Sequence, residues 1–267
     1  MRTVDLLPPI AVAVVVGGIA VLLSGRRELI RRWCAWAVAI PVIVGAFLLG
    51  PLATAVLVAA VGAVCVAEYS RLTASSATDR ALVTIVVIGL VAAAWAVPQE
   101  VPRLAAGGAL AVVAGPVLEG DAAHGFRRAA SSLLAVAWFT PLAVVVSLGP
   151  AALALLVAVS IADIAAYFGG RRLGGPMLSP LSPAKRWSGV LVGAAAGLGT
   201  LALLGAFSLP LAIGVAVGGP LGDLIESMVK RATGVKDAGT WLPGSGGLLD
   251  RVDSLLLALA VTAVLGW

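Results

Sequence analysis

Long apolar runs separated by short polar breaks follow one another along the entire chain. A helix needs roughly 20 apolar residues to cross a bilayer core about 30 Å thick. Runs near this length predict membrane helices at about 6–23, 33–49, 52–68, 81–97, 104–118, 129–148, 151–168, 190–207, 211–231 and 248–267. The pattern therefore predicts an all-α polytopic membrane protein with about nine or ten transmembrane helices.

The composition strengthens this prediction and excludes an ordinary soluble domain. Of the 267 residues, 61% are hydrophobic and 12% are charged, and the mean hydropathy is +1.09. The net charge of +5 comes from basic residues in short loops, which form no long basic face and therefore indicate no nucleic-acid partner. We expect residues 1–267 to form a single membrane domain, with an apolar helical scaffold over 1–160, polar motifs and cytoplasmic loops over 161–254, and a last helix over 248–267.

The distribution of basic residues predicts the orientation of the chain. If the N-terminus lies outside, every lysine and arginine except Arg2 and Arg103 falls on the opposite side of the membrane. Loops rich in lysine and arginine remain in the cytosol. We therefore expect both long polar loops, 169–189 and 234–247, at the cytoplasmic face.

One stretch, residues 222–254, crowds acids, bases, hydroxyls and glycines into an otherwise apolar chain. Burying charge in hydrocarbon costs several kcal/mol per group, so this density of polar residues indicates a functional site. Spacings of three and four place Asp223, Glu226 or Ser227, and Lys230 on one face of the predicted helix 211–231. A solvated helix end with intrahelical ion pairs is the alternative interpretation.

A second part of this stretch opens the last predicted helix. Asp250 and Asp253 are three residues apart, so both lie on one face at the helix start. Two carboxylates this close repel each other unless a cation lies between them, and oxygen ligands suit Mg²⁺. The glycine-rich turn 243–247 would let backbone N–H groups approach a phosphate. Helix capping with an ordinary ion pair is the competing explanation.

Further polar residues lie in the predicted helix 151–168 and the loop after it. Asp163 interrupts an apolar run, and an intramembrane carboxylate needs a partner or water. The loop then carries basic residues among glycine, proline and serine, which is typical of a phosphate-binding segment. Topology anchoring is the other role open to these residues, which are Arg171, Arg172, Lys185 and Arg186.

These motifs resemble those of one known family. SMVKR at 227–231, Lys236 and Asp237, PGSGG at 243–247 and DRVD at 250–253 resemble the C-terminal motif of the phosphatidate cytidylyltransferases, also called CDP-diacylglycerol synthases. This long, spaced motif is highly specific. The resemblance implies a membrane enzyme that joins CTP and phosphatidate to give CDP-diacylglycerol and pyrophosphate in phospholipid biosynthesis.

Two other segments are similar to regions of the same family. The family's other conserved region is similar to DIAAYFGGRRLG at 163–174 followed by LSPLSPAKRWSG at 178–189. A weaker conserved region of the family is similar to AEYSRL at 67–72. The strong resemblance thus covers 163–253. It implies a multi-pass protein of the cell inner (plasma) membrane with its active site facing the cytoplasm, and a homodimer.

The resemblance assigns roles to residues at matching positions. The implied catalytic residues are Asp223, Lys230, Lys236, Asp237, Asp250 and Asp253. The implied Mg²⁺ ligands, for more than one cation, are Asp223, Asp237, Asp250 and Asp253. The implied substrate-binding residues are Asp163, Lys185, Arg186, Ser227, Arg231, Gly244, Ser245, Gly246, Gly247 and Arg251.

Two positions depart from the family pattern and keep alternatives open. The family usually has His where this chain has Ser245, and an acidic residue where it has Ser188. A serine can donate a hydrogen bond to phosphate but does not titrate near neutral pH. The alternatives are cytidylyl transfer to another lipid phosphate, such as a polyprenyl or ether lipid, and a non-catalytic or transport protein of the same fold.

Overall fold

Helices account for nearly all of the structure, a computed structural model that describes the chain except residues 1, 25–26, 236–238, 240–245 and 267. The α-helices are α1 Leu7–Ser24, α2 Arg27–Leu49, α3 Pro51–Leu72, α4 Ala77–Ala96, α5 Val101–Leu118, α6 Gly125–Phe139, α7 Leu142–Leu148, α8 Pro150–Leu173, α9 Trp187–Leu203, α10 Leu209–Ile213, α11 Gly219–Thr233 and α12 Leu249–Val264. Short 3-10 turns are η1 Thr3–Leu6 and η2 Pro98–Glu100, and η3 Gly214–Gly218 is a π-helical turn.

The predicted apolar runs are helical, which confirms the all-α membrane class. Seven helical segments among the described residues are long and apolar enough to cross a membrane, and Trp33–Leu49 and Trp187–Leu203 are shorter apolar helices. The run predicted as one helix over 129–148 instead divides into α6 and α7. Pro141 lies at this break, and proline lacks the N–H that a continuous helix requires.

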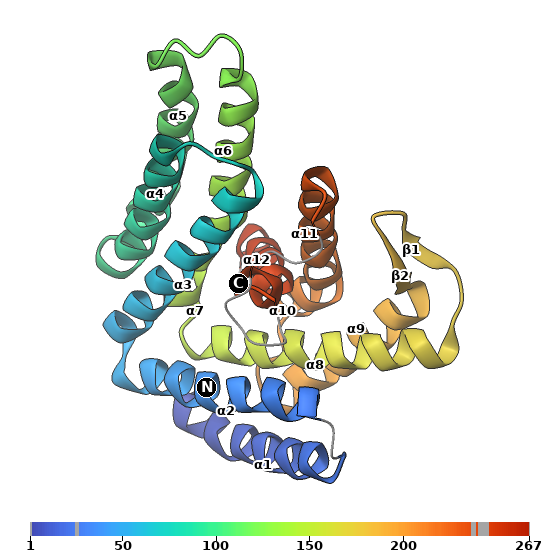
Figure 1. Ribbon diagram of the computed structural model, residues 1–267. Coiled ribbons are helices and arrows are strands. Elements are labelled where there is room, and N and C mark those ends of the chain that lie inside the picture. Colours follow the sequence, from blue (N-terminus) through green and yellow to red (C-terminus); the bar gives the residue numbers. More distant parts are fainter. Residues whose placement is uncertain (1, 25–26, 236–238, 240–245, 267) are drawn as a thin grey trace.

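The polar loop predicted over 169–189 contains regular structure. Helix α8 continues to Leu173 and ends at Gly174, whose φ of 64° suits glycine. The chain then forms an antiparallel hairpin of β1 Met177–Ser179 and β2 Ser182–Arg186. This hairpin stands at one side of the helical body, beside the end of α8 (Figure 1).

Two groups of helices, one of α4, α5 and α6 and the other of α8 and α9, lie around the central pair α11 and α12 (Figure 1). One group contains α4, α5 and α6, and α3 connects it to the rest of the protein. Helix α8 crosses the lower part of the view with α9 packed against it, and α11 and α12 lie side by side near the centre. A buried cluster that includes Tyr69, Trp138 and Phe139 joins these groups.

An ionic cluster ties the ends of α4, α5 and α6 together. Arg128 on α6 lies 2.8 Å from Asp79, 2.7 Å from Glu119 and 2.9 Å from Asp121. The Asp79 side chain is only 2% exposed, and Arg128 also donates to Ser76. Because a buried carboxylate needs a paired cation, Arg128 compensates the charge of Asp79 within this group of helices.

Two glycine stripes allow the helices near the site to pack closely. A Cβ atom at Gly189 or Gly193 of α9 would lie 2.7 Å from a backbone carbonyl of α8. A Cβ at Gly218 would lie 2.7 Å from the Cα of Ala258, and one at Gly222 would lie 3.0 Å from the Cα of Ser254 on α12. Such small-residue stripes are a general means of bringing membrane helices together.

We expect Gly193→Leu to lower the thermal unfolding temperature of the protein in detergent. The side chain would meet the backbone of α8, and overpacking costs about 1–3 kcal/mol or more. Gly199→Leu is the matched control, because a Cβ at Gly199 on the same helix meets nothing within 4 Å. Equal unfolding temperatures for the two variants would contradict the packing role of Gly193.

Candidate functional site

Three carboxylates from α11 and α12 meet at the centre of the site. Each of Asp223, Glu226 and Asp253 contributes an oxygen atom, and these atoms lie within 4.8 Å of one another. Glu226 and Asp253 are buried, with 2% and 6% exposed surface. The short distance depends on Gly222, which lets α11 approach the backbone of α12. Carboxylates this close repel each other unless a proton or cation is shared between them.

The arrangement of these acids fits a divalent cation. The Oε1 atom of Glu226 is buried and has no hydrogen-bond partner among the described residues. An orphaned buried oxygen of this kind is costly unless an ion or another group satisfies it. Oxygen ligands of carboxylates suit Mg²⁺. The donor set therefore fits the predicted metal.

Lys230 joins two of the acidic residues. Its Nζ donates to Oε2 of Glu226 at 2.8 Å and to Oδ1 of Asp250 at 3.0 Å. The other oxygen of Asp250 accepts the backbone N–H of Gly247 at 2.6 Å. Gly246 has a φ of 77°, which favours glycine, and it lies against the Asp250 side chain. Asp250 is thus held by both the glycine-rich turn and α11.

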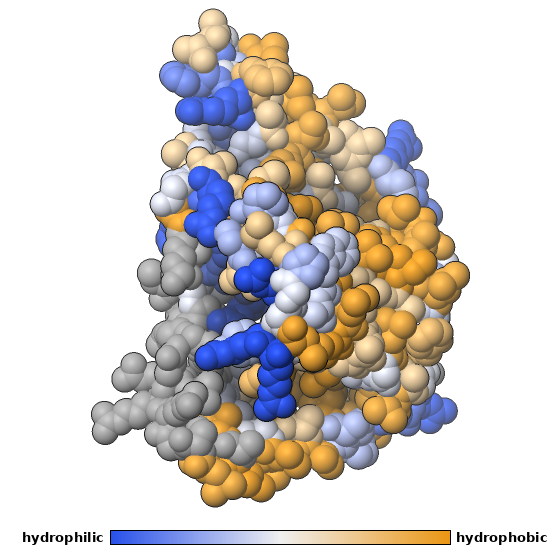
Figure 2. All heavy atoms as spheres, turned by 90° about the vertical axis from the view of Figure 1, so that its right-hand side faces the viewer, coloured by the Kyte–Doolittle hydropathy of each residue, from blue (hydrophilic) through white to orange (hydrophobic). Residues whose placement is uncertain are grey.

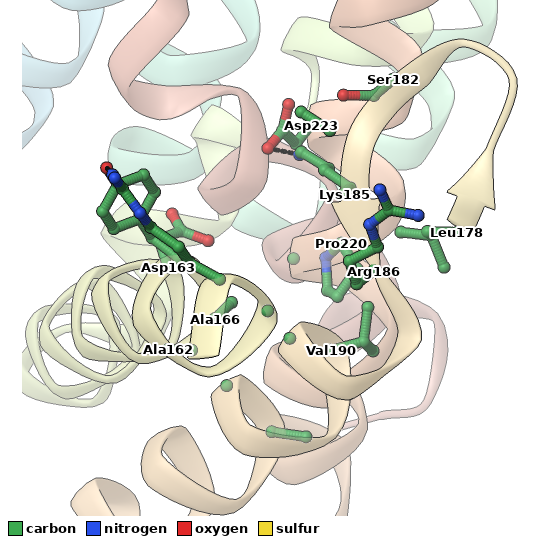
Figure 3. Close-up of a pocket in the computed structure, with 18 of the residues that line it drawn as sticks. Ala162, Asp163, Ala166, Leu178, Ser182, Lys185, Arg186, Val190, Pro220 and Asp223 are labelled. Carbon is green, nitrogen blue, oxygen red and sulfur yellow. Dashed lines mark hydrogen bonds and ion pairs between the residues drawn. The ribbon is translucent and has the colours of Figure 1, made fainter. Parts of the chain in front are cut away.

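The hairpin supplies a second lysine. Lys185 on β2 forms an ion pair with Asp223, marked by a dashed line in Figure 3. Burial lowers the pKa of Lys185 below its ordinary value, although the nearby carboxylates of Asp253 and Asp163 favour its charged form. The hairpin, absent from the sequence prediction, is therefore what brings this residue to the acidic cluster.

A cavity of about 680 Å³ lies between α8, the hairpin, α9 and α11. Its polar lining includes Asp163, Arg171, Lys185, Arg186 and Asp223, while apolar and glycine residues of α8, α9 and η3 form much of the remainder. Figure 3 shows Asp163, Lys185 and Asp223 approaching this space from three elements. Figure 2 shows hydrophilic side chains gathered on the same side of the molecule, next to extensive apolar surface.

The structure brings several predicted site residues together. Those that meet in the acidic cluster or its cavity are Asp163, Lys185, Arg186, Asp223, Lys230, Asp250 and Asp253. Ser227 and Arg231 instead line a small separate cavity of about 120 Å³ with Lys230. Arg251 is half-buried on the first turn of α12. Four predicted residues, Lys236, Asp237, Gly244 and Ser245, lie outside the described residues.

Two residues of the site were given no role by the sequence motifs. Glu226 shares a helix face with Asp223, and this spacing of three was the available signal. Glu68 on α3 is 2% exposed and accepts the N–H groups of Leu248 at 3.0 Å and Leu249 at 2.7 Å. Its signal was a carboxylate at the end of an apolar run, within the AEYSRL segment.

Ser188, one of the two departures from the family pattern, has a local structural contact. The hydroxyl of Ser188 donates to the carbonyl oxygen of Gly174, at the point where α8 ends. This bond joins the start of α9 to the chain before the hairpin. Ser188 therefore fixes the base of the hairpin.

Fold and site together define a polytopic helical membrane protein with clustered acids and lysines suited to a cation and phosphate groups. Residues 30–267 match the family described as "Cytidylyltransferase family". The chain belongs to this family, as its motifs predicted.

Curated relatives share part of this sequence. A protein of Brucella suis named phosphatidate cytidylyltransferase is 49% identical over 113 residues, which are 39% of this chain and 42% of the relative. One of the same name from Pseudomonas aeruginosa is 42% identical over 139 residues, 44% of this chain and 49% of the relative. Phosphatidate cytidylyltransferase 4, chloroplastic, of Arabidopsis thaliana is 40% identical over 108 residues, 37% of this chain and 28% of the relative. The chain therefore spans less than half the length of the curated relatives it matches.

Proposed function

We propose that the protein transfers a cytidylyl group from CTP to phosphatidate, producing CDP-diacylglycerol and pyrophosphate. The observation that carries this proposal is the convergence of Asp223, Glu226 and Asp253 with Lys185 and Lys230, beside a cavity between membrane helices. Membership of the cytidylyltransferase family and the names of the relatives support the same reaction.

In this reaction an oxygen of the lipid phosphate attacks the α-phosphorus of CTP. The bond from that phosphorus to the oxygen bridging to the β-phosphorus breaks, and pyrophosphate leaves. Both reactants are anions, so the protein chiefly has to align them and stabilise the charge of the leaving group.

The chain's own residues are arranged for this task. Asp223, Glu226 and Asp253 would hold Mg²⁺, which supplies charge neutralisation when bound. Lys185 and Arg186 would bind phosphate oxygens from the hairpin side of the cavity. Lys230 holds Glu226 and Asp250 in place. The roles of Asp250 as a metal ligand, and of Lys236, Asp237 and Ser245, stay predictions.

The setting of the reaction is also part of the proposal. The charge asymmetry of the loops supports a cytoplasmic active site, where CTP is available, and the bacterial relatives support the inner membrane. A homodimer stays a prediction.

Cytidylyl transfer is tested directly with the purified chain in mixed micelles. Labelled CTP and Mg²⁺ are incubated with phosphatidate, a polyprenyl phosphate or an ether-lipid phosphate, and the lipid product is identified by mass spectrometry. We expect CDP-diacylglycerol from phosphatidate at the highest rate. A higher rate with another acceptor would show that phosphatidate is not the preferred substrate. If no acceptor is converted, and Ser245→His creates activity, the non-catalytic alternative is favoured.

A further inference from the structure

Glu68 is a buried carboxylate that the proposed reaction does not use. It lies near the end of α3, in a helix whose other residues are mostly apolar, and it is 2% exposed. Both of its carboxylate oxygens accept hydrogen bonds from the start of α12. Oε1 accepts the N–H of Leu248 at 3.0 Å, and Oε2 accepts the N–H of Leu249 at 2.7 Å.

These bonds provide the cap that α12 lacks in its own sequence. The first N–H groups of a helix have no intrahelical partner and need another acceptor. Leu248 occupies the N-cap position of α12 and has no side-chain oxygen to accept them. A carboxylate is favoured at this end by the helix dipole. Glu68 therefore caps α12 from a helix that lies 180 residues earlier in the chain.

The two glycines that flank the segment 240–246 pack against the same carboxylate. A Cβ atom at Gly239 would lie 2.6 Å from Oε1 of Glu68, and one at Gly247 would lie 2.6 Å from Oε2. A side chain at either place would displace the Glu68 carboxylate from its position at the start of α12. The N–H of Gly247, immediately before those of Leu248 and Leu249, donates to Asp250.

We propose that Glu68 is a positioning residue that fixes the N-terminus of α12 and so places Asp250 and Asp253 against Lys230 and Glu226. Asp250 is the first residue after the two capped positions, and Asp253 follows on the next turn. A small rotation or fraying of this end would move both acids relative to α11. The catalytic consequence rests on the proposed cytidylyl transfer, whereas the capping contact does not.

Hydrogen–deuterium exchange in detergent tests the capping contact without CTP or lipid. In Glu68→Gln we expect the amides of 247–254 to exchange at least about tenfold faster, because an amide side chain offers one acceptor oxygen instead of two. Peptides of α4 should keep their rates. Tyr69→Phe is the matched control, because it removes a part-buried hydrogen bond of the adjacent residue to Ser131 on α6 and keeps both bonds of Glu68 to α12.

The positioning role is tested by the Mg²⁺ dependence of cytidylyl transfer. We expect Glu68→Gln to lower kcat by about 10–100-fold and to raise the Mg²⁺ concentration for half-maximal rate, as loss of groups that orient metal ligands does elsewhere. Tyr69→Phe should change neither. Unchanged exchange at 247–254 would overturn the capping contact. Faster exchange with wild-type kcat and Mg²⁺ dependence would overturn the positioning role, and an inactive parent chain would overturn the proposed reaction while the exchange result stands.

Discussion

Asp253→Asn is expected to lower cytidylyl transfer by about 10³-fold, measured as kcat/KM with phosphatidate and Mg²⁺. The change keeps the size of the side chain but removes one of the three converging carboxylates. A bound cation supplies several kcal/mol of transition-state stabilisation, and each 1.36 kcal/mol is a factor of ten in rate. Weakened cation binding would therefore appear as a large loss of rate.

Asp121→Asn is the control for this prediction. Asp121 also forms an ion pair, with Arg128 at 2.9 Å, but it belongs to the cluster at the ends of α4, α5 and α6. We expect its activity to stay within about threefold of the parent chain, a change of less than 1 kcal/mol. An Asp253→Asn variant that retained parental activity at low Mg²⁺ would contradict the cation site.

Lys230→Met is expected to lower the free energy of unfolding by about 3–5 kcal/mol, because removing one partner of a buried ion pair leaves uncompensated charge. Lys230 is 16% exposed and is bonded to both Glu226 and Asp250. The variant would leave these two acids close together without their shared cation. Thermal unfolding in detergent should show a clear fall in the transition temperature.

Two further variants isolate the electrostatic cause of this loss. Adding Glu226→Gln to Lys230→Met should recover part of the stability, because it removes one of the two repelling charges. Arg231→Met should have little effect, since Arg231 is exposed and its hydrogen bond to the carbonyl oxygen of Leu181 is long, at 3.4 Å. If Lys230→Met unfolds at the parental temperature, the bonds of Lys230 do not stabilise the fold.

Membrane helices were the most predictable part of this protein. The requirement for about 20 apolar residues is local, so α3, α4 and α8 were located to within a few residues of their apolar cores. The break at Pro141 was missed because proline is tolerated in membrane helices, where neighbouring groups can satisfy the freed carbonyls. The hairpin was missed because its short strands carry no strong alternating pattern.

The candidate site was predictable only in part. Spacing alone placed Asp250 and Asp253 on one face of α12, and it correctly indicated a cluster of acids and lysines. In the fold, Asp253 joins Asp223 and Glu226, whereas Asp250 binds Lys230 and the N–H of Gly247. No spacing rule relates residues on different helices, so the partners of each acid could not be read from the sequence.

The amino-acid sequence by itself determined the membrane class, the approximate helices and the chemical character of residues 222–254, because hydropathy and motif spacing are local properties. Tertiary structure decided which acids meet, how Lys185 reaches Asp223, and that Glu68 caps α12. These contacts depend on close helix packing, as at Gly222 and Gly193, where the absence of a side chain sets the distance between backbones. That distance is a property of two helices together, and no single stretch of sequence contains it.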